Sequence, residues 1–308
     1  MGVAHRSDRA AIALILAGGM GQRMRPVTRD ERPKQFLNLI LKDQSLLQAT
    51  AKRVSEIPNV RSLWIVSGER FRDEVKRQLP QLPPTNLILE PVGRGTGPSI
   101  VWATLEVAEG HPMSQVMLFT PSDHWIENEN AFHGVVSSAI ELAAQTKQII
   151  LIGVAPTYAS TEYGYIKKAE IVTSSKEIEA HRVQAYIEKP MLQLANQLVN
   201  SGDYYWNSGI LISRVDVLLQ ELRRVVPKTV RLLETGGLNA FYDLQPFSIE
   251  HTVLQTTENA VVVPGDFGWH DIGTLDSLVK LSATTETNFI GSGGGVPPDS
   301  DPSTNPGF

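Results

Sequence analysis

Short apolar runs alternate with longer amphipathic stretches through the first half of the chain. Five apolar runs predict buried strands, at residues 11–16, 63–66, 86–89, 116–119 and 149–152. The stretches between them carry apolar residues at helical spacing and predict helices, at residues 45–55, 70–78, 98–108 and 131–145. Strand and helix in alternation predict an α/β fold with a mainly parallel sheet and right-handed crossovers. Binding residues should then gather beyond the carboxyl ends of the strands.

The pattern changes after about residue 153. Short strand-like pieces occur at residues 164–167, 183–187, 208–212 and 260–263, among helical pieces at residues 192–200 and 215–225. We interpret them as an extension of the same sheet and not as an independent second domain. From residue 282 onward the chain is rich in Gly, Ser, Pro and Thr and cannot bury enough apolar surface to fold alone. The expected organisation is a catalytic domain over residues 1–281, with a flexible stretch at 1–10, followed by a disordered tail at 282–308.

Composition narrows the class of protein. The chain has 308 residues, of which 42% are hydrophobic and 20% charged, as in an ordinary globular enzyme. A net charge of -5 gives no general attraction for nucleic acid or for anionic membranes. The absence of cysteine excludes disulfides, thiolate catalysis and Cys-based metal sites. No apolar run reaches the length of a membrane helix, and the first one is better explained as a strand than as a signal peptide, so we expect a soluble cytoplasmic protein.

The first segment with candidate chemistry, LAGGMGQRMRPVTRDERPKQFL, directly follows the first predicted strand. Gly18, Gly19 and Gly21 let the backbone approach a ligand closely, and successive N–H groups in such a turn bind phosphate oxygens. Arg23 and Lys34 add positive charge in an otherwise acidic protein. The alternative is a glycine-rich turn beside a solvated basic stretch. Neither the GxGxxG fingerprint nor the P-loop pattern is present, which argues against a dinucleotide-binding oxidoreductase.

A carboxylate follows another predicted strand. Asp123 lies in LFTPSDHWIENENAF, just after the run at residues 116–119. Such an acid suits Mg²⁺, which takes oxygen ligands and keeps several waters and phosphate oxygens. A turn-forming Asp that caps the next segment is the structural alternative.

These segments resemble, in type and in order, the nucleotidyltransferase superfamily that makes nucleotide sugars. The first is similar to its GGxGxRLxPLT signature with a PK dipeptide, and the forms PKQFL, EPVGRGTGPSI and PSDH resemble the mannose-1-phosphate guanylyltransferase branch. The resemblance extends over about residues 11–279. It implies a Rossmann-like three-layer α/β/α nucleotidyltransferase domain with a mainly parallel central sheet.

The resemblance implies a nucleotide site and also shows two departures from the family. The implied nucleotide-binding residues are Leu16, Ala17, Gly18, Gly19, Gly21, Gln22, Arg23, Lys34, Glu90, Arg94, Thr96, Ser122 and Asp123. Gly95 replaces the Asn that is usual in EPxGRNTAPAI, and Gly97 replaces the usual Ala. Without any ligand role, this segment would simply cap the helix that opens at Pro98.

Three later segments resemble the sugar-phosphate half of the family's site. They are the YGYI, AYIEKP and YWNSGILI stretches, and they assign sugar-phosphate binding to Gly164, Tyr165, Glu188, Lys189 and Asn207. Glu188 accepts from hydroxyls, Lys189 binds phosphate as a point charge, and Asn207 both donates and accepts. A hairpin with aromatic cross-strand packing is the structural alternative for YGYI.

The last segment, FGWHDIGTLDSL, looks like the family's WxDxG element. It assigns Asp271 as the second carboxylate on Mg²⁺, opposite Asp123, although capping of a helix is a rival role. The catalytic residues that the resemblance implies are Arg23, Lys34, Asp123, Lys189 and Asp271.

The implied reaction joins GTP and mannose 1-phosphate into GDP-mannose and pyrophosphate, with Mg²⁺ as cofactor. A heptose 1-phosphate guanylyltransferase and a glucose 1-phosphate thymidylyltransferase are close alternatives. A nucleotide-sugar-binding regulatory homologue without turnover is a third, motivated by Gly95, by Gly97 and by Gln255–Thr256 in place of a usual Glu-Lys pair. We expect no nucleic-acid or membrane partner, and the sequence leaves open whether the protein is a homodimer.

Overall fold

The computed structural model describes residues 10–25, 27–30, 32–174, 178–274, 277–279 and 281. Its strands are β1 (Ala11–Leu16), β2 (Val60–Gly68), β3 (Leu87–Glu90), β4 (Val116–Pro121), β5 (His124–Ile126), β6 (Ile149–Val154), β7 (Gly164–Ser174), β8 (Glu179–Glu188), β9 (Tyr204–Arg214), β10 (Ala260–Gly265) and β11 (Trp269–Asp271). Its α-helices are α1 (Leu46–Ser55), α2 (Arg72–Gln78), α3 (Thr96–Gly110), α4 (Glu129–Gln145), α5 (Leu192–Ser201), α6 (Val215–Val225) and α7 (Pro227–Gly236). Every strand and helix predicted above is present, with longer strands in the second half.

The main sheet is mixed, so the prediction of a mainly parallel sheet was wrong. Its strand order is β3-β2-β1-β4-β9-β6-β10-β8-β7. Among the described residues, β1–β2, β1–β4, β2–β3 and β6–β10 pair in parallel, whereas β4–β9, β6–β9, β8–β10, β7–β8 and β7–β9 are antiparallel. The strands of the second half join the same sheet, as predicted. Their antiparallel pairing follows from β7 and β8, which form a hairpin, and from β9, which runs against both of its central neighbours.

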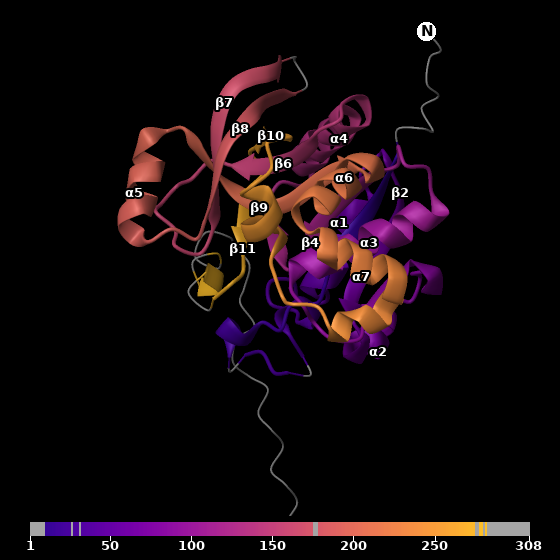
Figure 1. Cartoon of the computed structure of the whole chain (residues 1–308). Helices are drawn as coiled ribbons and strands as arrows, with labels where there is room; N and C mark the ends of the chain where they lie inside the picture. Colours follow the sequence, from indigo (N-terminus) through magenta and orange to yellow (C-terminus); the bar gives the residue numbers. More distant parts are fainter. Residues whose placement is uncertain are drawn as a thin grey trace, which may run out of the picture.

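The second half of the sheet closes on itself. Because β9 also pairs with β7, the strands β9, β6, β10, β8 and β7 form a small closed barrel at one end of the sheet. Figure 1 shows β7, β8 and α5 on the side of the molecule opposite to β2 and α2.

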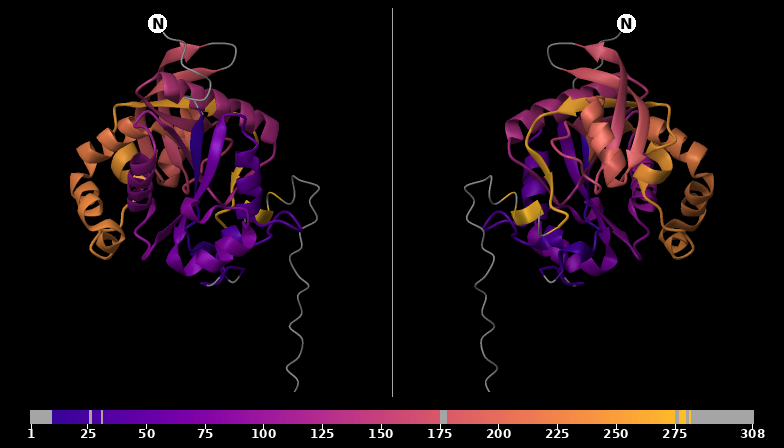
Figure 2. Two further views of the ribbon diagram at one scale, coloured as in Figure 1. Left: turned by 90° about the vertical axis from the view of Figure 1, so that its right-hand side faces the viewer. Right: turned by 90° about the vertical axis from the view of Figure 1, so that its left-hand side faces the viewer.

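Two hydrophobic cores cover the two faces of the sheet. One core contains residues of α3, α6 and α7 together with Ile12 and Leu14, and the other contains residues of α4 and α5 together with Ala11 and Ala13. Because both faces of β1 are covered, the strand is apolar throughout and does not alternate. Figure 2 shows α6 and α7, in orange, at one flank of the molecule in both views.

Some expectations concern residues that the structure does not describe. The flexible stretch at residues 1–10, except for Ala10, and the tail at 282–308 lie outside the described residues, so the domain boundary at 281 stays a prediction. Within the described part of the chain, no helix combines the length and the apolar character needed to cross a membrane.

Candidate active site

Strand register brings the glycine-rich turn and Asp123 to the same edge of the sheet. In the parallel pair β1–β4, Leu16 lies opposite Pro121, so both strands end together. The backbone N–H of Ser122 then donates to the Leu16 carbonyl at 3.1 Å, which joins the two loops beyond these ends. Ser122 and Ala17 thus act here through the backbone, since the Ala17 N–H also donates to the Val66 carbonyl at 2.7 Å.

A buried glutamine holds the glycine-rich turn in shape. Gln35 is 1% exposed, and its Nε2 donates to the carbonyls of Ala17 at 3.0 Å and of Gly19 at 2.9 Å. Gly21 has φ +59°, in the left-handed region that favours glycine, and its carbonyl accepts from Thr28 Oγ1 at 2.7 Å. Gln35 was not predicted, because its role depends on a turn that lies far from it until the chain folds. The side chain of Gln22, a predicted nucleotide ligand, lies outside what the structure describes.

The turn borders a cavity of about 240 Å³. Of the predicted nucleotide-binding residues, those that line it are Leu16, Gly18, Gly19, Glu90, Thr96 and Asp123. Gly209 and Glu250 line it as well and were not predicted. Burial raises the pKa of Glu250, and the nearby Glu188 carboxylate adds to the rise, so this acid links the cavity to the predicted sugar side.

Glu90 presents a hydrogen-bond acceptor to this cavity. Its side chain lies at the end of β3 and is 4% exposed, and Oε1 accepts no hydrogen bond within the described part of the chain. Burial raises the pKa of Glu90 to about 7. A buried carboxylate oxygen without a partner is costly, which points to a ligand that donates to it.

Hydrogen bonds hold the loop before α3 against residues 241–250. Arg94 donates from Nε to the Phe241 carbonyl at 2.8 Å and from Nη2 to the Tyr242 carbonyl at 2.7 Å. Thr96 Oγ1 donates to Glu250 Oε2 at 2.9 Å. Arg94 is not among the residues that line the cavity, because its guanidinium is engaged by these two carbonyls. The structure therefore does not bring Arg94 into the cavity as a nucleotide ligand.

Lys34 lies between the two predicted metal ligands. Its Nζ is 2.9 Å from Asp123 Oδ2 and 3.4 Å from Asp271 Oδ1, and it donates to the Ile272 carbonyl at 2.9 Å. Asp271 reaches this place because β11 pairs with β5, with Asp271 opposite His124. Three side chains from distant parts of the chain thus converge on one point.

The charges of this cluster stabilise one another. Burial alone would lower the pKa of Lys34, but the carboxylates of Asp123 and Asp271 outweigh it and raise that pKa. Burial would raise the pKa of Asp123, but Lys34 and His124 together lower it. Burial lowers the pKa of His124 against the pull of both carboxylates. The shifts therefore favour an ionised Asp123 carboxylate beside the Lys34 ammonium group and a neutral His124 imidazole.

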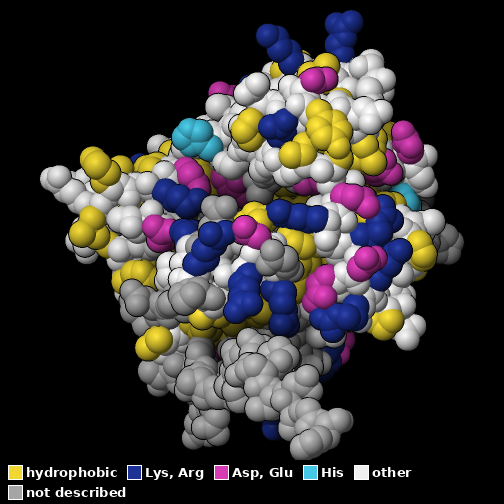
Figure 3. Space-filling view, turned by 90° about the horizontal axis from the view of Figure 1, so that it is seen from below, with side chains coloured by type: hydrophobic (Ala, Val, Ile, Leu, Met, Phe, Trp, Pro, Cys, Tyr) yellow, Lys and Arg dark blue, Asp and Glu magenta, His cyan; other side chains and the backbone are white. Residues whose placement is uncertain are grey.

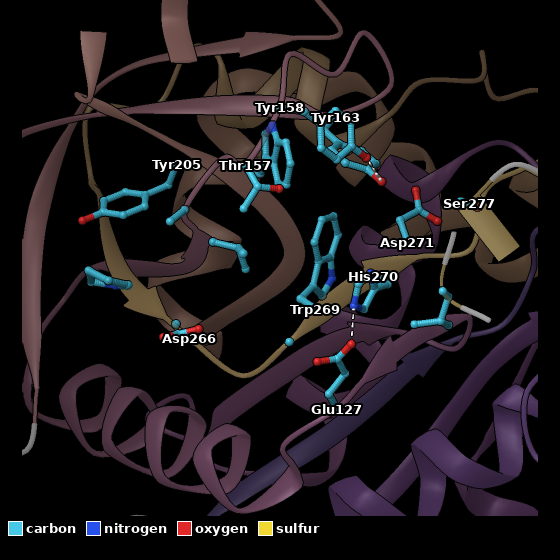
Figure 4. Close-up of a pocket in the computed structure, with 17 residues that line it drawn as sticks. Glu127, Thr157, Tyr158, Tyr163, Tyr205, Asp266, Trp269, His270, Asp271 and Ser277 are labelled. Atoms are coloured by element: carbon cyan, nitrogen blue, oxygen red, sulfur yellow. Dashed lines mark hydrogen bonds and ion pairs between the residues drawn. The ribbon is translucent and has the colours of Figure 1, made fainter. Parts of the chain in front are cut away.

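Aromatic packing fixes the strand that carries Asp271. Trp269 Nε1 donates to His124 Nδ1 at 3.1 Å, and the Trp269 ring lies 5.1 Å from that of Tyr163 between centroids. Trp269, Asp271, Glu127 and His270 line a cavity of about 690 Å³. Figure 4 shows Trp269 at the centre of the view, with the Glu127–His270 pair below it and Asp271 on the side of Ser277.

Arg23 stands at the mouth of the site. It forms an ion pair with Glu162 and lines, together with Asp271 and Tyr163, a second cavity of about 570 Å³. Figure 3 views this end of the molecule, where Lys and Arg side chains gather with Asp and Glu side chains between them. Charges of both signs are therefore intermixed on this face, and Arg23 brings a positive charge to the border of the cavity.

Four of the five predicted sugar-phosphate residues come together around Tyr186. Gly164 lies opposite Glu188 in the β7–β8 ladder, and a Cβ at this glycine would overlap Tyr186. The Tyr186 hydroxyl donates to Glu188 Oε2 at 3.1 Å and accepts from Asn207 Nδ2 at 2.9 Å. Lys189 pairs with Glu188 at 2.8 Å. Tyr186 was not predicted, because its contacts with Gly164 and Asn207 form only when the strands pair.

The fifth predicted sugar residue, Tyr165, is placed elsewhere. It is fully buried in the core, and its hydroxyl accepts from the Ser160 N–H at 2.9 Å and donates to the Ser160 carbonyl at 3.0 Å. Strand alternation explains this, because adjacent residues of β7 face opposite sides of the sheet, and Gly164 takes the site side. Tyr165 therefore supports the loop before β7 and is not brought to the sugar group.

The chain is similar to known proteins over most of its length. Residues 12–288 match the nucleotidyl transferase family. The chain is similar to the mannose-1-phosphate guanylyltransferase of Escherichia coli, at 35% identity over 286 residues that cover 88% of this chain and 61% of that protein. It is also similar to the xanthan biosynthesis protein XanB of Xanthomonas campestris pv. campestris strain ATCC 33913, at 38% identity over 88% of this chain and 59% of that protein. The chain thus spans about three fifths of the length of these relatives.

Among solved structures, the fold is similar to that of a Thermus thermophilus protein described as a mannose-1-phosphate geranyltransferase. The TM-score is 0.75 at 27% sequence identity, and the match covers 85% of this chain and 76% of that one.

Proposed function

The chain belongs to the nucleotidyl transferase family, and we propose that it transfers the guanylyl group of GTP to mannose 1-phosphate, which yields GDP-mannose and pyrophosphate. The observation that carries this proposal is the convergence of Lys34, Asp123 and Asp271 beside the glycine-rich turn. One cationic and two anionic groups at a phosphate-binding turn suit a reaction at a metal-bound polyphosphate.

The two carboxylates fit a divalent cation. The Lys34 ammonium contacts both of them, which shows that they converge on one positive charge. The described residues contain no group of three or more acidic or His side chains that would enclose a metal. This donor set suits Mg²⁺, which is held by one or two carboxylates and takes its other ligands from phosphate and water. When bound, Mg²⁺ neutralises charge on the phosphate oxygens.

Glu90 supports guanine as the base. Guanine carries two adjacent donors, N1–H and the exocyclic amino group, and a carboxylate accepts from both. Glu90 Oε1 is buried in the cavity beside Gly18 and lacks a partner within the described residues. Donation from the base would stabilise the ionised form of an acid whose pKa is raised to about 7. Adenine presents no such pair of donors on that edge.

The sugar phosphate would occupy the group around Tyr186. Lys189 supplies a positive charge for the phosphate, and Glu188 and Asn207 supply acceptors and a donor for hydroxyls. Lys189 has φ +44°, which is unusual for a residue with a side chain and is typical of functional sites. Its backbone N–H donates to the Tyr163 carbonyl at 3.2 Å, which holds this conformation.

The chemistry then needs little beyond positioning. A phosphate oxygen of mannose 1-phosphate attacks the α-phosphorus of GTP in line and forms a new P–O bond. The bond between the α-phosphorus and the oxygen that bridges to the β-phosphate breaks, and pyrophosphate leaves. The attacking oxygen is already ionised, so no strong general base is required. Arg23 and Lys34 would stabilise the charge on the triphosphate, while Lys189 would orient the nucleophile.

The test is pyrophosphate release with Mg²⁺, in which GTP, ATP, dTTP, UTP and CTP are each paired with mannose 1-phosphate, glucose 1-phosphate and a heptose 1-phosphate. We expect release with GTP and mannose 1-phosphate. Asp271→Asn should lower turnover by at least about 100-fold, because it removes a charged metal ligand. Its thermal melt serves as the control for folding. Release with another pair would assign that substrate, and tight GDP-mannose binding without any release would favour the regulatory homologue.

A further inference from the structure

The Lys34 ammonium is fully satisfied in the ligand-free protein. An ammonium group has three donors, and this one meets the carboxylates of Asp123 and Asp271 and the carbonyl of Ile272. The residue is 9% exposed, so these contacts are made away from bulk water. Such a group has no need of a further partner, and it occupies the point on which both carboxylates converge.

The surroundings hold the backbone of Lys34 in place. Lys34 opens the short 3-10 helix Lys34–Phe36, and its neighbour Gln35 is anchored to the glycine-rich turn. Gly21 packs against the Lys34 backbone, since a Cβ there would lie 3.2 Å from its nitrogen. The four-carbon stem can therefore redirect the charge from the carboxylates to the adjacent turn without a change of fold.

Charge balance disfavours the simultaneous presence of the Lys34 ammonium group and a divalent cation between Asp123 and Asp271. Without Lys34, two carboxylates would face each other in a poorly solvated place, which is costly. With Lys34 present, an incoming divalent cation would meet a positive charge at hydrogen-bond distance from both of its ligands. The phosphates of a nucleotide at the glycine-rich turn offer the ammonium an alternative set of anionic oxygens.

We propose that Lys34 occupies the metal position in the nucleotide-free protein and that nucleotide phosphates draw it away, so that the metal binds only together with the nucleotide. This inference rests on the proposed function, which supplies the nucleotide and the metal. It makes Lys34 a residue that serves two charge-balancing roles in turn, first for the carboxylates and then for the phosphates.

The experiment measures Mn²⁺ binding without nucleotide, by the electron paramagnetic resonance signal of free Mn²⁺. Wild-type protein should bind Mn²⁺ weakly, and Lys34→Met should bind it tighter by roughly tenfold or more, because the competing charge is gone. Lys34→Met combined with Asp271→Asn should lose the gain. Lys189→Met is the matched control, since Lys189 pairs with Glu188 and not with these aspartates, and it should behave like wild type.

A second measurement guards against loss of folding. Mg²⁺ should raise the melting temperature of Lys34→Met, or of Lys34→Gln if the first variant does not fold, by more than it raises that of wild type. Equal Mn²⁺ affinity in wild type and the Lys34 variant would overturn the inference. The proposed function is tested separately. Normal pyrophosphate release by Asp271→Asn would contradict the assignment of Asp271 as a metal ligand. If the wild type releases pyrophosphate and also binds Mn²⁺ tightly without nucleotide, only the proposed role of Lys34 is contradicted.

Discussion

At the scale of single residues, the cost of burying the Glu90 carboxylate indicates a ligand-binding role. The carboxylate is buried at a strand end, and one oxygen lacks a partner within the described residues. A glutamine in the same place would keep the shape and avoid the burial of a charge. A ligand that donates to this oxygen would offset that cost.

Glu90→Gln should lose selectivity for guanine. The wild type should prefer GTP over inosine triphosphate, which lacks the 2-amino donor, whereas the variant should distinguish them less, by about tenfold in the ratio of kcat/KM. The loss follows because an amide offers one acceptor where the carboxylate offers two. Glu56→Gln, at an exposed position after α1, is the matched control. An unchanged GTP preference in Glu90→Gln would remove this residue from base recognition.

The same carboxyl predicts a pH dependence of stability. Its pKa is about 7 in the folded protein against an ordinary value of 4.5. Between these pH values the folded protein holds a proton that the unfolded chain has released, so its contribution to stability falls as pH rises and levels off above 7. The fall is at most about 3 kcal/mol. In urea unfolding, the free energy of unfolding of Glu90→Gln should rise relative to that of wild type between pH 5 and 7.5. A difference that stays constant over this range would argue against this pKa.

At the scale of elements, the start of α3 and the segment around Phe247 are fitted to each other. The Gly97 N–H donates to the Phe247 carbonyl at 3.1 Å, and the Phe247 N–H donates to the Arg94 carbonyl at 3.1 Å. A Cβ at Gly97 would overlap the Phe247 ring, and Gly95 has φ +84°. The Phe247 ring therefore fills the space beside Gly97, whereas at Gly95 it is the Phe247 backbone carbonyl that approaches closely.

Gly97→Ala should destabilise the protein by about 1–3 kcal/mol, because the added methyl group overlaps Phe247. Gly93→Ala is the matched control, since a Cβ there meets nothing within 4 Å. In the background of Phe247→Leu, the cost of Gly97→Ala should shrink, and this coupling can be measured as a double-mutant cycle in urea. Full additivity of the two changes would mean that the ring is not what excludes the methyl group.

The helices and strands could be predicted where burial produces a local pattern of apolar residues in the sequence. The runs that became β1, β4 and β6 are apolar throughout because helices cover both of their faces. The strands β7, β8 and β9 were predicted too short. In β7, for example, the outer part carries polar residues such as Lys167, Lys168 and Glu170 and is only partly buried, so it contains no apolar run. Which strand pairs with which, and in which direction, depends on contacts between distant residues, so the mixed sheet and its closed barrel were not predictable from periodicity.

At the scale of the whole molecule, the site is assembled from both ends of the chain. Lys34, Asp123 and Asp271 were found in the sequence because each belongs to a recognisable segment, but only the β5–β11 pairing brings Asp271 to the other two. Gln35, Tyr186 and Glu250 were not predicted because each contacts a partner outside its own sequence segment, namely Ala17, Asn207 and Thr96 respectively. The residue types of a site can therefore be predicted locally, whereas its supporting contacts cannot.

This assembly predicts where a ligand should slow hydrogen exchange. Addition of GTP and Mg²⁺ at about 100 times the dissociation constant stabilises the site by about 2.7 kcal/mol, so amides that exchange by opening it should slow by up to about 100-fold. Protection is expected at residues 17–25 and at residues 266–272 together, because both segments contribute to the charge cluster. The outer part of the β7–β8 hairpin, residues 168–174 and 179–182, should not change, since it lies away from that cluster.

The control for this exchange experiment is Asp271→Asn, which should keep protection at residues 17–25, through the glycine-rich turn, and lose most of it at residues 266–272. The separation follows because the turn binds phosphates through its own backbone N–H groups, whereas β11 contributes mainly the Asp271 carboxylate. Protection of both segments in the variant would mean that β11 closes on the nucleotide through other contacts. Protection of neither segment in wild type would mean that nucleotide does not bind at this edge of the sheet, and the proposed function would fail with it.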